Sequence, residues 1–535
     1  MLLSLRTLLF FFLVLPFVHG ANAQSPYLQL FDGQSSDRIT ALLTTDDAVY
    51  LSGNYSPSAT LDGTDLPAYG EDDIFLRKTD PAGNALWTLT GGGNFDDRSE
   101  ALSIDPEGNL YWTGSYRGTA TLGDTTLNDP TNQKASFVAR IGPEGTLLWV
   151  VTFRGTGFKN IDDLVYTDGR VAVVGSFSEE LLLPNGDLLP SSSDDRSAFM
   201  SILDATTGAL LLTDQVGTTG TFAARAVAVA PNGTLHLAGD FRGSGQVQSQ
   251  TIQTQTQNDD VFYLRASPTS GFESIRRIGG ANQALATDIA TDADGNSYLS
   301  GNFFGLISTG TGLSTSSNNF QTDGFLLRID AGGEPLWLRD FGGDGADNIN
   351  AIYVAGDRVV VTGNFSESFS TSINYELQTA QTAGYLAKFR ADTGVNTSGF
   401  TTTGDGLVNV FALAPGFGGP IFGGQFTGTL QLSALSAGAG SGFSGFWGQT
   451  GSSTVPTRDF LPARAVHIFP NPAAEFLQID LKESKLHSWT LYDLAGYPLH
   501  YGTETRVPRS HLPSGTYLLE LRTDRGRVTR LVHFQ

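Results

Sequence analysis

The sequence predicts an all-β protein, made of a seven-bladed β-propeller of four-stranded blades and a small C-terminal β-sandwich. Three observations predict this fold: a phrase that recurs seven times at nearly constant spacing, hairpin signals in every copy, and a change of composition near residue 454. The chain has 535 residues, which exceeds one ordinary domain of roughly 100–200 residues.

Residues 1–23 predict a secretory signal peptide that is cleaved after Ala23. A singly basic start is followed by an apolar stretch, Thr7 to Val18, and then by the small-x-small pattern Ala21-Asn22-Ala23. The alternative is a membrane anchor, but this stretch contains Pro16 and is shorter than the about 20 apolar residues that span a bilayer. We expect an exported mature chain that begins near Gln24 and has no transmembrane anchor.

Residues 24–453 contain a repeated glycine, followed each time by a polar residue and an aromatic. The glycines lie 61, 61, 64, 62, 62 and 61 residues apart: Gly53, Gly114, Gly175, Gly239, Gly301, Gly363 and Gly424. An aromatic that opens an apolar run follows each glycine by 22 to 24 residues: Phe75, Phe137, Phe199, Phe262, Phe325, Tyr385 and Phe446. Short strand-type runs around Asp/Asn-Gly turns indicate about four antiparallel strands per unit, which suits a propeller blade better than a β-helix coil.

The ends of the repeat indicate how the ring closes. The seventh unit lacks its last strand after Trp447-Gly448, and the missing pattern stands at Leu28 to Gly33. We expect this N-terminal strand to complete the last blade and to hide two sheet edges. Five units have a small residue at one register of the inner strand, which suits a crowded axis: Ala41, Ala101, Ala226, Ala351 and Ala412. In the two other units, Asp163 and Asp288 take this register.

The units resemble the seven-bladed propeller repeats of exported bacterial proteins. Phrases such as Ala290 to Gly301 and Asp73 to Arg77 carry the resemblance, which covers about four fifths of the chain. It implies a fold and no particular activity, because one fold hosts many functions.

A polar linker is expected at residues 454–464, and residues 465–535 form a second all-β unit. The segments Phe469 to Ala473, Tyr492 to Gly496 and Leu512 to Tyr517 resemble the type A C-terminal sorting domain of the type IX secretion system. This resemblance implies Sec export and passage across the outer membrane through the type IX machinery, to the cell surface or the medium. The motif positions are Pro470, Asn471, Pro472, Gly496, Gly515, Tyr517 and Arg530. The last strand is typically Lys-rich in that family but carries Arg and His here, and the alternative is an ordinary accessory β-sandwich.

Charge and composition exclude several classes of function. The net charge of -22 argues against a nucleic-acid partner, and the absence of cysteine removes disulfides, thiol nucleophiles and Cys-ligated zinc. Residues 24–463 hold 22 basic and 47 acidic residues, a balance of -25. This acidity favours a solvated surface, or else cationic or calcium-bridged partners.

The sequence predicts no catalytic residue and no cofactor. His236, the propeller's single histidine, and the tryptophans Trp87, Trp149 and Trp337 are interpreted as packed residues. Asp73, Asp260 and Asp323 are interpreted as turn caps, and Asp292 as part of a hairpin turn. Asp163 and Asp288 would line the channel and are the weak candidates for a calcium site.

The predicted function is that of an exported cell-surface or secreted propeller that binds a surface protein or a glycan. An extracellular polysaccharide hydrolase or lyase is the alternative, and a purely architectural spacer is a third possibility. An enzyme of this kind needs two carboxylates, here from different blades, that converge within about 5–10 Å.

Overall fold

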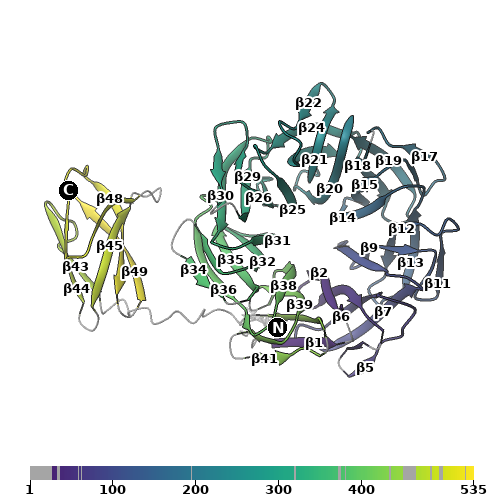
Figure 1. The fold of residues 1–535 in the computed structure, drawn as a ribbon, viewed down its shortest axis with the longest axis horizontal. Coiled ribbons are helices and arrows are strands. Elements are labelled where there is room, and N and C mark those ends of the chain that lie inside the picture. The colour runs from purple at the N-terminus through teal and green to yellow at the C-terminus, as the bar shows by residue number, and fades with distance from the viewer. Residues whose placement is uncertain are drawn as a thin grey trace, which may run out of the picture.

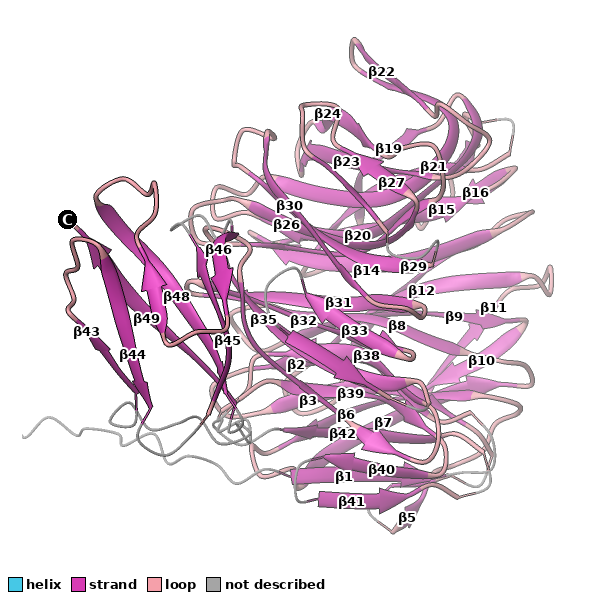
Figure 2. Cartoon of the chain, turned by 60° about the vertical axis from the view of Figure 1, so that its left-hand side comes forward, coloured by secondary structure: helices cyan, strands magenta, loops and turns pink. Residues whose placement is uncertain are grey.

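The computed structural model describes residues 27–449, except 33–35, 58, 62, 194, 318–320, 372–374, 380, 418, 433–434 and 441. It also describes residues 466–535, except 482–484, 493–497 and 524–525. The predicted signal peptide and linker lie outside the described residues, so these boundaries remain predictions. Figure 2 shows strands and loops throughout the described part, where no helix is long and apolar enough to cross a membrane.

Seven antiparallel sheets form a ring, and each is built on four strands (Figure 1). The first strands are β2 (Arg38–Thr44), β8 (Arg98–Ile104), β14 (Lys159–Thr167), β20 (Thr219–Val229), β25 (Ala284–Thr291), β31 (Asp347–Ala355) and β38 (Val408–Ala414). The second strands are β3 (Val49–Tyr55), β9 (Leu110–Arg117), β15 (Arg170–Phe177), β21 (Leu235–Val247), β26 (Ser297–Phe304), β32 (Arg358–Phe365) and β39 (Ile421–Phe426). We number the blades 1 to 7 in this order.

The third strands are β6 (Asp73–Thr79), β12 (Lys134–Ile141), β18 (Ser197–Asp204), β23 (Asp260–Ser267), β29 (Thr322–Ile329), β35 (Ala383–Arg390) and β42 (Ser444–Gln449). The fourth strands are β7 (Ala85–Gly93), β13 (Leu147–Phe153), β19 (Leu210–Val216), β24 (Gly271–Ile278), β30 (Pro335–Gly342), β36 (Asn396–Thr401) and, in blade 7, β1 (Tyr27–Asp32). Neighbouring first strands contact one another around a closed cycle, from β2 to β38 and back to β2. The predicted propeller fold is confirmed, and seven sheets agree with the seven units.

The N-terminal strand closes the ring as expected. β1 pairs antiparallel with β42, so that Tyr27 opposes Gln449 and Phe31 opposes Gly445. Phe31 is buried and lies edge-on to Phe75 of blade 1, with ring centroids 5.2 Å apart. The strand therefore contributes both backbone hydrogen bonds to blade 7 and an aromatic side chain to the junction with blade 1.

The excursions between second and third strands have a role that the sequence analysis did not foresee. Their hairpins pair with the outer strand, or its continuation, of the preceding blade: β4 with β1, β10 with β7, β33 with β30 and β40 with β37. Single bridges make the same link between Arg154 and Leu182 and between Gly279 and Ser308. These contacts cover edges that would otherwise be open.

The strands of these excursions are β4 (Thr60–Leu61), β5 (Thr64–Asp65), β10 (Thr119–Leu122), β11 (Thr125–Asn128), β16 (Glu180–Leu182), β17 (Leu188–Pro190) and β22 (Gln250–Gln253). Further along the chain they are β27 (Leu306–Ser308), β28 (Ser314–Ser316), β33 (Ser368–Thr371), β34 (Tyr375–Gln378), β40 (Thr429–Leu432) and β41 (Leu435–Gly438). β37 (Thr403–Gly404) continues beyond the fourth strand of blade 6.

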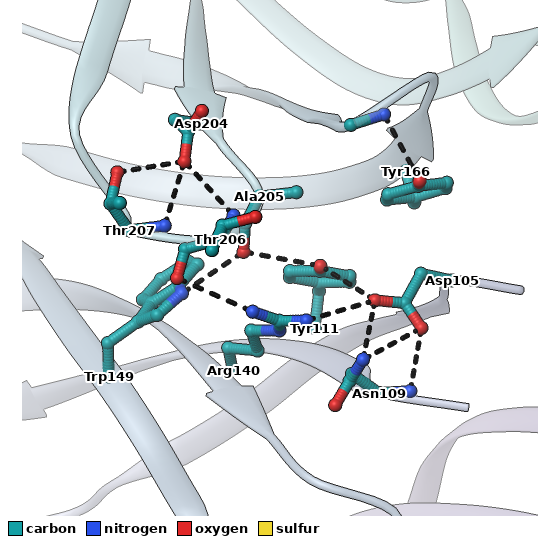
Figure 3. A network of polar contacts seen from close by, with 11 residues as sticks. Asp105, Asn109, Tyr111, Arg140, Trp149, Tyr166, Asp204, Ala205, Thr206 and Thr207 are labelled. Atoms are coloured by element: carbon teal, nitrogen blue, oxygen red, sulfur yellow. Dashed lines mark hydrogen bonds and ion pairs between the residues drawn. The ribbon is translucent and has the colours of Figure 1, made fainter. Parts of the chain in front are cut away.

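The repeated tryptophans join neighbouring blades, which confirms the packing interpretation. The indole of Trp149 donates a 3.1 Å hydrogen bond to the carbonyl of Ala205, in the next blade (Figure 3). Trp87 and Trp337 donate in the same way to Pro143 and Ala391, at 2.9 and 3.2 Å. A buried indole N–H needs such an acceptor, so each tryptophan fixes one junction.

The C-terminal unit is a sandwich of two sheets, as predicted. One sheet has the order β43-β44-β47 and the other β46-β45-β48-β49. Their bounds are β43 (Val466–Phe469), β44 (Phe476–Leu481), β45 (Leu486–Tyr492), β46 (Pro498–Gly502), β47 (Arg506–Pro508), β48 (Gly515–Thr523) and β49 (Gly526–Phe534). Leu477 from the first sheet and Trp489, Leu519 and Val532 from the second belong to one buried core.

Candidate binding site at the centre of the ring

Every first strand of the ring carries a β-bulge at the same place. The register with the second strand shifts by one residue immediately before the small-residue register, and the skipped residues are Thr40, Glu100, Asp162, Arg225, Thr287, Asn350 and Phe411. A bulge re-aims the side chain of the extra residue and recurs next to functional sites. The seven blades thus present seven bulged side chains on adjoining inner strands, six of them polar or charged.

The two aspartates singled out by the sequence analysis link neighbouring inner strands. Asp163 accepts the N–H groups of Leu164 and of Val227, in the next blade, both at 2.8 Å. Asp288 does the same with Ile289 and Ile352, at 2.7 and 2.8 Å. Burial raises the pKa of Asp163 to about 8 and that of Asp288 to about 7. The structure shows a linking role, and a calcium site at these two aspartates remains a prediction.

Removal of one such link should destabilise the ring. Asp163→Ala leaves the N–H groups of Leu164 and Val227 without their acceptor, at about 1–3 kcal/mol each, so we expect the free energy of unfolding to fall by about 2–6 kcal/mol. Urea unfolding of the mature protein at pH 7 measures the loss. Asp46→Ala, which changes an exposed aspartate in the β2–β3 turn, is the control. An unchanged unfolding midpoint for Asp163→Ala would contradict the linking role.

Arg225, the bulged residue of blade 4, holds two acidic side chains. Its Nε and Nη2 donate to the two carboxylate oxygens of Asp240, at 2.7 and 3.2 Å. Its Nη1 donates at 3.3 Å to Oδ1 of Asp162, the bulged residue of blade 3. Oδ2 of Asp162 is buried and has no hydrogen-bond partner among the described residues.

Glu100, the bulged residue of blade 2, lies among three cations. Burial raises its pKa to about 7, while the charges of Lys134, Arg98 and Arg38 oppose the rise. The Lys134 ammonium donates a 2.8 Å hydrogen bond to Oδ1 of Asn160. Burial lowers the pKa values of Lys134 and Arg38, and the charge of Arg98 acts in the same direction on both. The charge of Asp162 acts on the pKa of Glu100 in the opposite direction to these three cations.

We call these seven residues the central cluster: Arg38, Arg98, Glu100, Lys134, Asp162, Arg225 and Asp240. Sequence reasoning missed the cluster because the bulged position holds a different residue in each blade and forms no motif. The one signal that the sequence offers is the location of the bulged position, directly before the register of Ala41, Ala101 and Asp163. Charges from several blades that meet at perturbed pKa values mark a candidate functional site.

Other candidate sites offer fewer groups that could bind a ligand or catalyse a reaction. His236 is buried, its Nδ1 lies 2.6 Å from the hydroxyl of Tyr263, and burial lowers its pKa to about 4, as expected of a packed strand residue. A pocket of about 470 Å³ at the seam of blades 7 and 1 is lined by Leu61, Leu66 and Arg77 among others, but by no carboxylate. No group of three or more His, Cys, Asp or Glu side chains in the described part is arranged to hold a metal.

Most of the predicted sorting residues gather at the end of the last strand. Oδ1 of Asn471, between Pro470 and Pro472, accepts the N–H of His533 at 2.8 Å. Gly515 opposes Phe534, and the hydroxyl of Tyr517 donates to the carbonyl of Pro513 at 2.8 Å. Arg530 lies midway along β49, opposite Leu519, and Gly496 lies outside the described residues.

Fold and C-terminal unit define an exported β-propeller protein. Residues 467–533 match the family described as the secretion system C-terminal sorting domain, which confirms the resemblance inferred from the sequence. The type IX machinery is therefore a partner of this chain, and the protein is delivered to the cell surface or the extracellular space.

The propeller is similar to proteins of several kinds. The uncharacterized WD repeat-containing protein L264 of Acanthamoeba polyphaga mimivirus is 22% identical over 436 residues; the match covers 66% of this chain and 31% of that protein's length. A β-propeller domain of the trilobed protease from Pyrococcus furiosus, with an open velcro topology, has a TM-score of 0.38 and 8% identity, over 76% of this chain and 96% of that one. The rhamnogalacturonan lyase YesW has a TM-score of 0.30 and 10% identity, over 80% and 91%. Neither score bears on activity.

Proposed function

We propose that this protein is a cell-surface or secreted binding module whose central cluster recognises an acidic glycan. One observation carries the proposal: Arg38, Arg98 and Lys134 lie around Glu100 and its neighbour Asp162, within a propeller whose balance is strongly negative. An anionic group of the ligand would relieve the repulsion among these cations.

The neighbouring bulged residues support a sugar as the carrier of that anion. Thr40, Thr287 and Asn350 occupy the equivalent places in three other blades, and none of them is fully buried. Their hydroxyl and amide groups are the hydrogen-bonding groups that orient a polar ligand in a binding site. A carboxylate or sulfate among sugar hydroxyls matches this combination of cations and neutral polar groups.

Binding to uronic-acid and sulfated polysaccharides, measured by calorimetry with the mature protein, tests the proposal. We expect binding to these and not to neutral glycans, and at least tenfold weaker binding for Arg98→Gln and for Lys134→Gln. Arg390→Gln is the matched control, because Arg390 is exposed at the β35–β36 turn, where it pairs only with Asp392 among the described residues. Equal binding by all variants, or none to any acidic glycan, would contradict the proposal.

Hydrolysis is the second candidate, favoured by Glu100 and Asp162. These carboxyls come from neighbouring blades, and the charge of Asp162 helps to raise the pKa of Glu100 to about 7, suitable for a general acid. The same samples separate the two functions: a hydrolase releases reducing ends from the bound polysaccharide and Glu100→Gln stops the release, whereas a binding module releases none.

A further inference from the structure

Three third strands carry a buried aspartate near their start: Asp73, Asp260 and Asp323. Each carboxylate lies over a glycine near the end of the fourth strand or directly after it. A Cβ added at Gly92, Gly279 or Gly342 would come within 2.0, 1.9 or 2.2 Å of the Oδ1 atom above it. Glycine at these places leaves room for a carboxylate. Turn capping explains only part of the role of these aspartates: Asp73 accepts the N–H of Tyr69, and Asp260 accepts that of Gly280.

Two of these aspartates face a second aspartate from the next blade. Asp97 and Asp347 precede or begin the first strands of blades 2 and 6, and both are 1% exposed. Their Oδ2 atoms accept the N–H groups of Gly93 and Gly343, at 2.6 Å in both cases. Burial raises the pKa of Asp97 to about 7 and of Asp347 to about 8, and the charges of Asp73 and Asp323 add to the rise.

The third aspartate shows how the fold compensates a buried charge when no second carboxylate is present. Opposite Asp260, the next blade has Ala284 at the register of Asp97 and Asp347. Asp260 is instead neutralised by Arg277, whose Nε lies 2.6 Å from its Oδ2. Within the described residues Asp73, Asp97 and Asp347 form no ion pair with Lys or Arg. Two buried carboxyls at one junction need another source of positive charge, or a proton.

Buried oxygen atoms without a donor lie at both junctions. Between blades 1 and 2 they are Oδ1 of Asp73, of Asp97 and of Asn54, none of which accepts a hydrogen bond from the described residues. The amide of Asn54, itself 0% exposed, is held against Asp97, because its Nδ2 donates to the Asp97 carbonyl at 2.5 Å. Between blades 5 and 6 they are Oδ1 of Asp347 and the hydroxyl of Tyr385, whose pKa rises through burial and the charge of Asp347.

We propose that each of these two junctions binds one calcium ion, which joins the third strand of one blade to the first strand of the next. Carboxylate oxygens together with a neutral amide or hydroxyl oxygen are the ligands that hard cations take. Calcium fits better than magnesium, because it accepts irregular oxygen shells, whereas magnesium demands a near-ideal octahedron and retains its water. The proposal is independent of the central cluster and of any glycan.

Calorimetric titration of the chelator-treated mature protein with calcium chloride tests the proposal. We expect two sites with dissociation constants on the order of 10⁻⁴–10⁻³ M, as in other extracellular modules, and a higher thermal unfolding midpoint in calcium. Asp97→Asn should lower the stoichiometry from two to one, and Asp97→Asn with Asp347→Asn to zero. These variants remove a buried negative charge and should fold without calcium.

Asp260→Asn is the control, because it changes an aspartate at the register of Asp73 and Asp323 that already pairs with Arg277, and it should leave both sites intact. If a variant fails to fold, the titration of the unmodified protein alone tests the proposal. The proposal is overturned by an absence of heat and of any thermal shift in 10 mM calcium, a concentration of about ten times the weakest affinity expected. It is equally overturned if calcium binds with unchanged stoichiometry to the double variant.

Discussion

Removal of residues 24–33 from the mature chain is expected to abolish cooperative unfolding of the propeller and to make the protein prone to aggregate. The deletion takes away β1 and leaves β42 as an open edge, with β38, β39 and β42 alone in blade 7. It also empties the place of Phe31, which lies so close over Gly445 that a Cβ there would come within 1.8 Å of its ring. Thermal unfolding and light scattering of the deleted chain measure both effects.

Two further measurements separate strand loss from loss of one side chain. Phe31→Ala should keep the ring closed but lower the free energy of unfolding by about 3–5 kcal/mol, the usual cost of truncating a buried phenylalanine. Gln29→Ala, on the same strand but only partly buried, is the control. A synthetic peptide of residues 24–34 should restore the unfolding midpoint of the deleted chain. A deleted chain that unfolds like the full one would show that β1 does not close the ring.

Ring closure was predictable because it rests on local patterns. The end of each unit reads alike, so a missing pattern after Trp447 and a surplus one at Leu28 to Gly33 could be matched without knowledge of any contact. The blade count follows in the same way from the spacing of Gly53 and its six equivalents. Hairpin turns such as Asp292 to Asn296, where Oδ1 of Asp292 accepts the N–H of Asn296 at 2.9 Å, are also local and were found.

The junctions between blades were not predictable, because they depend on which registers meet across a boundary. Asp73 was interpreted as a turn cap, whereas its neighbour across the boundary is Asp97, directly before the first strand of the next blade. The bulge that presents Glu100 leaves no mark in the sequence, since one extra residue shifts the pairing without changing residue types. The role of the excursions, which cover the preceding blade, escaped notice for the same reason.

The junctions also explain how an acidic ring without disulfides is held together. Three kinds of interblade link recur: a tryptophan N–H to a carbonyl, a carboxylate to inner-strand N–H groups, and the two buried carboxyl pairs. The first two are complete within the described residues, whereas each carboxyl pair brings two like charges together, and like charges repel. An exported protein meets conditions that it does not control, so the carboxyl pairs are where its stability can respond to the surroundings.

Loss of the last two strands, β48 and β49, should abolish delivery to the cell surface. Residues that resemble the sorting motif hold the end of β49 by hydrogen bonds. The N–H of Ala473 donates to the carbonyl of His533 at 2.8 Å, and the carbonyl of Ala473 accepts the N–H of Gln535 at 2.9 Å. The Arg509 guanidinium also holds this end, since it donates hydrogen bonds to the carbonyls of Leu512 and Gln535 and to the hydroxyl of Ser514. A chain that ends at residue 513 should therefore accumulate in the periplasm of a type IX-secreting host, with its propeller folded.

Point variants distinguish recognition of the C-terminal end from mere presence of the sandwich. Arg509→Ala and Asn471→Ala keep the buried core of the two sheets but release the end of β49, and we expect each to lower the surface-exposed fraction at least tenfold in labelling of whole cells. Glu504→Gln, at an exposed position of the same unit, should leave delivery unchanged. Normal delivery of both point variants, with the truncated chain still retained, would mean that delivery depends on the presence of β48 and β49 and not on the hydrogen bonds that hold the end of β49.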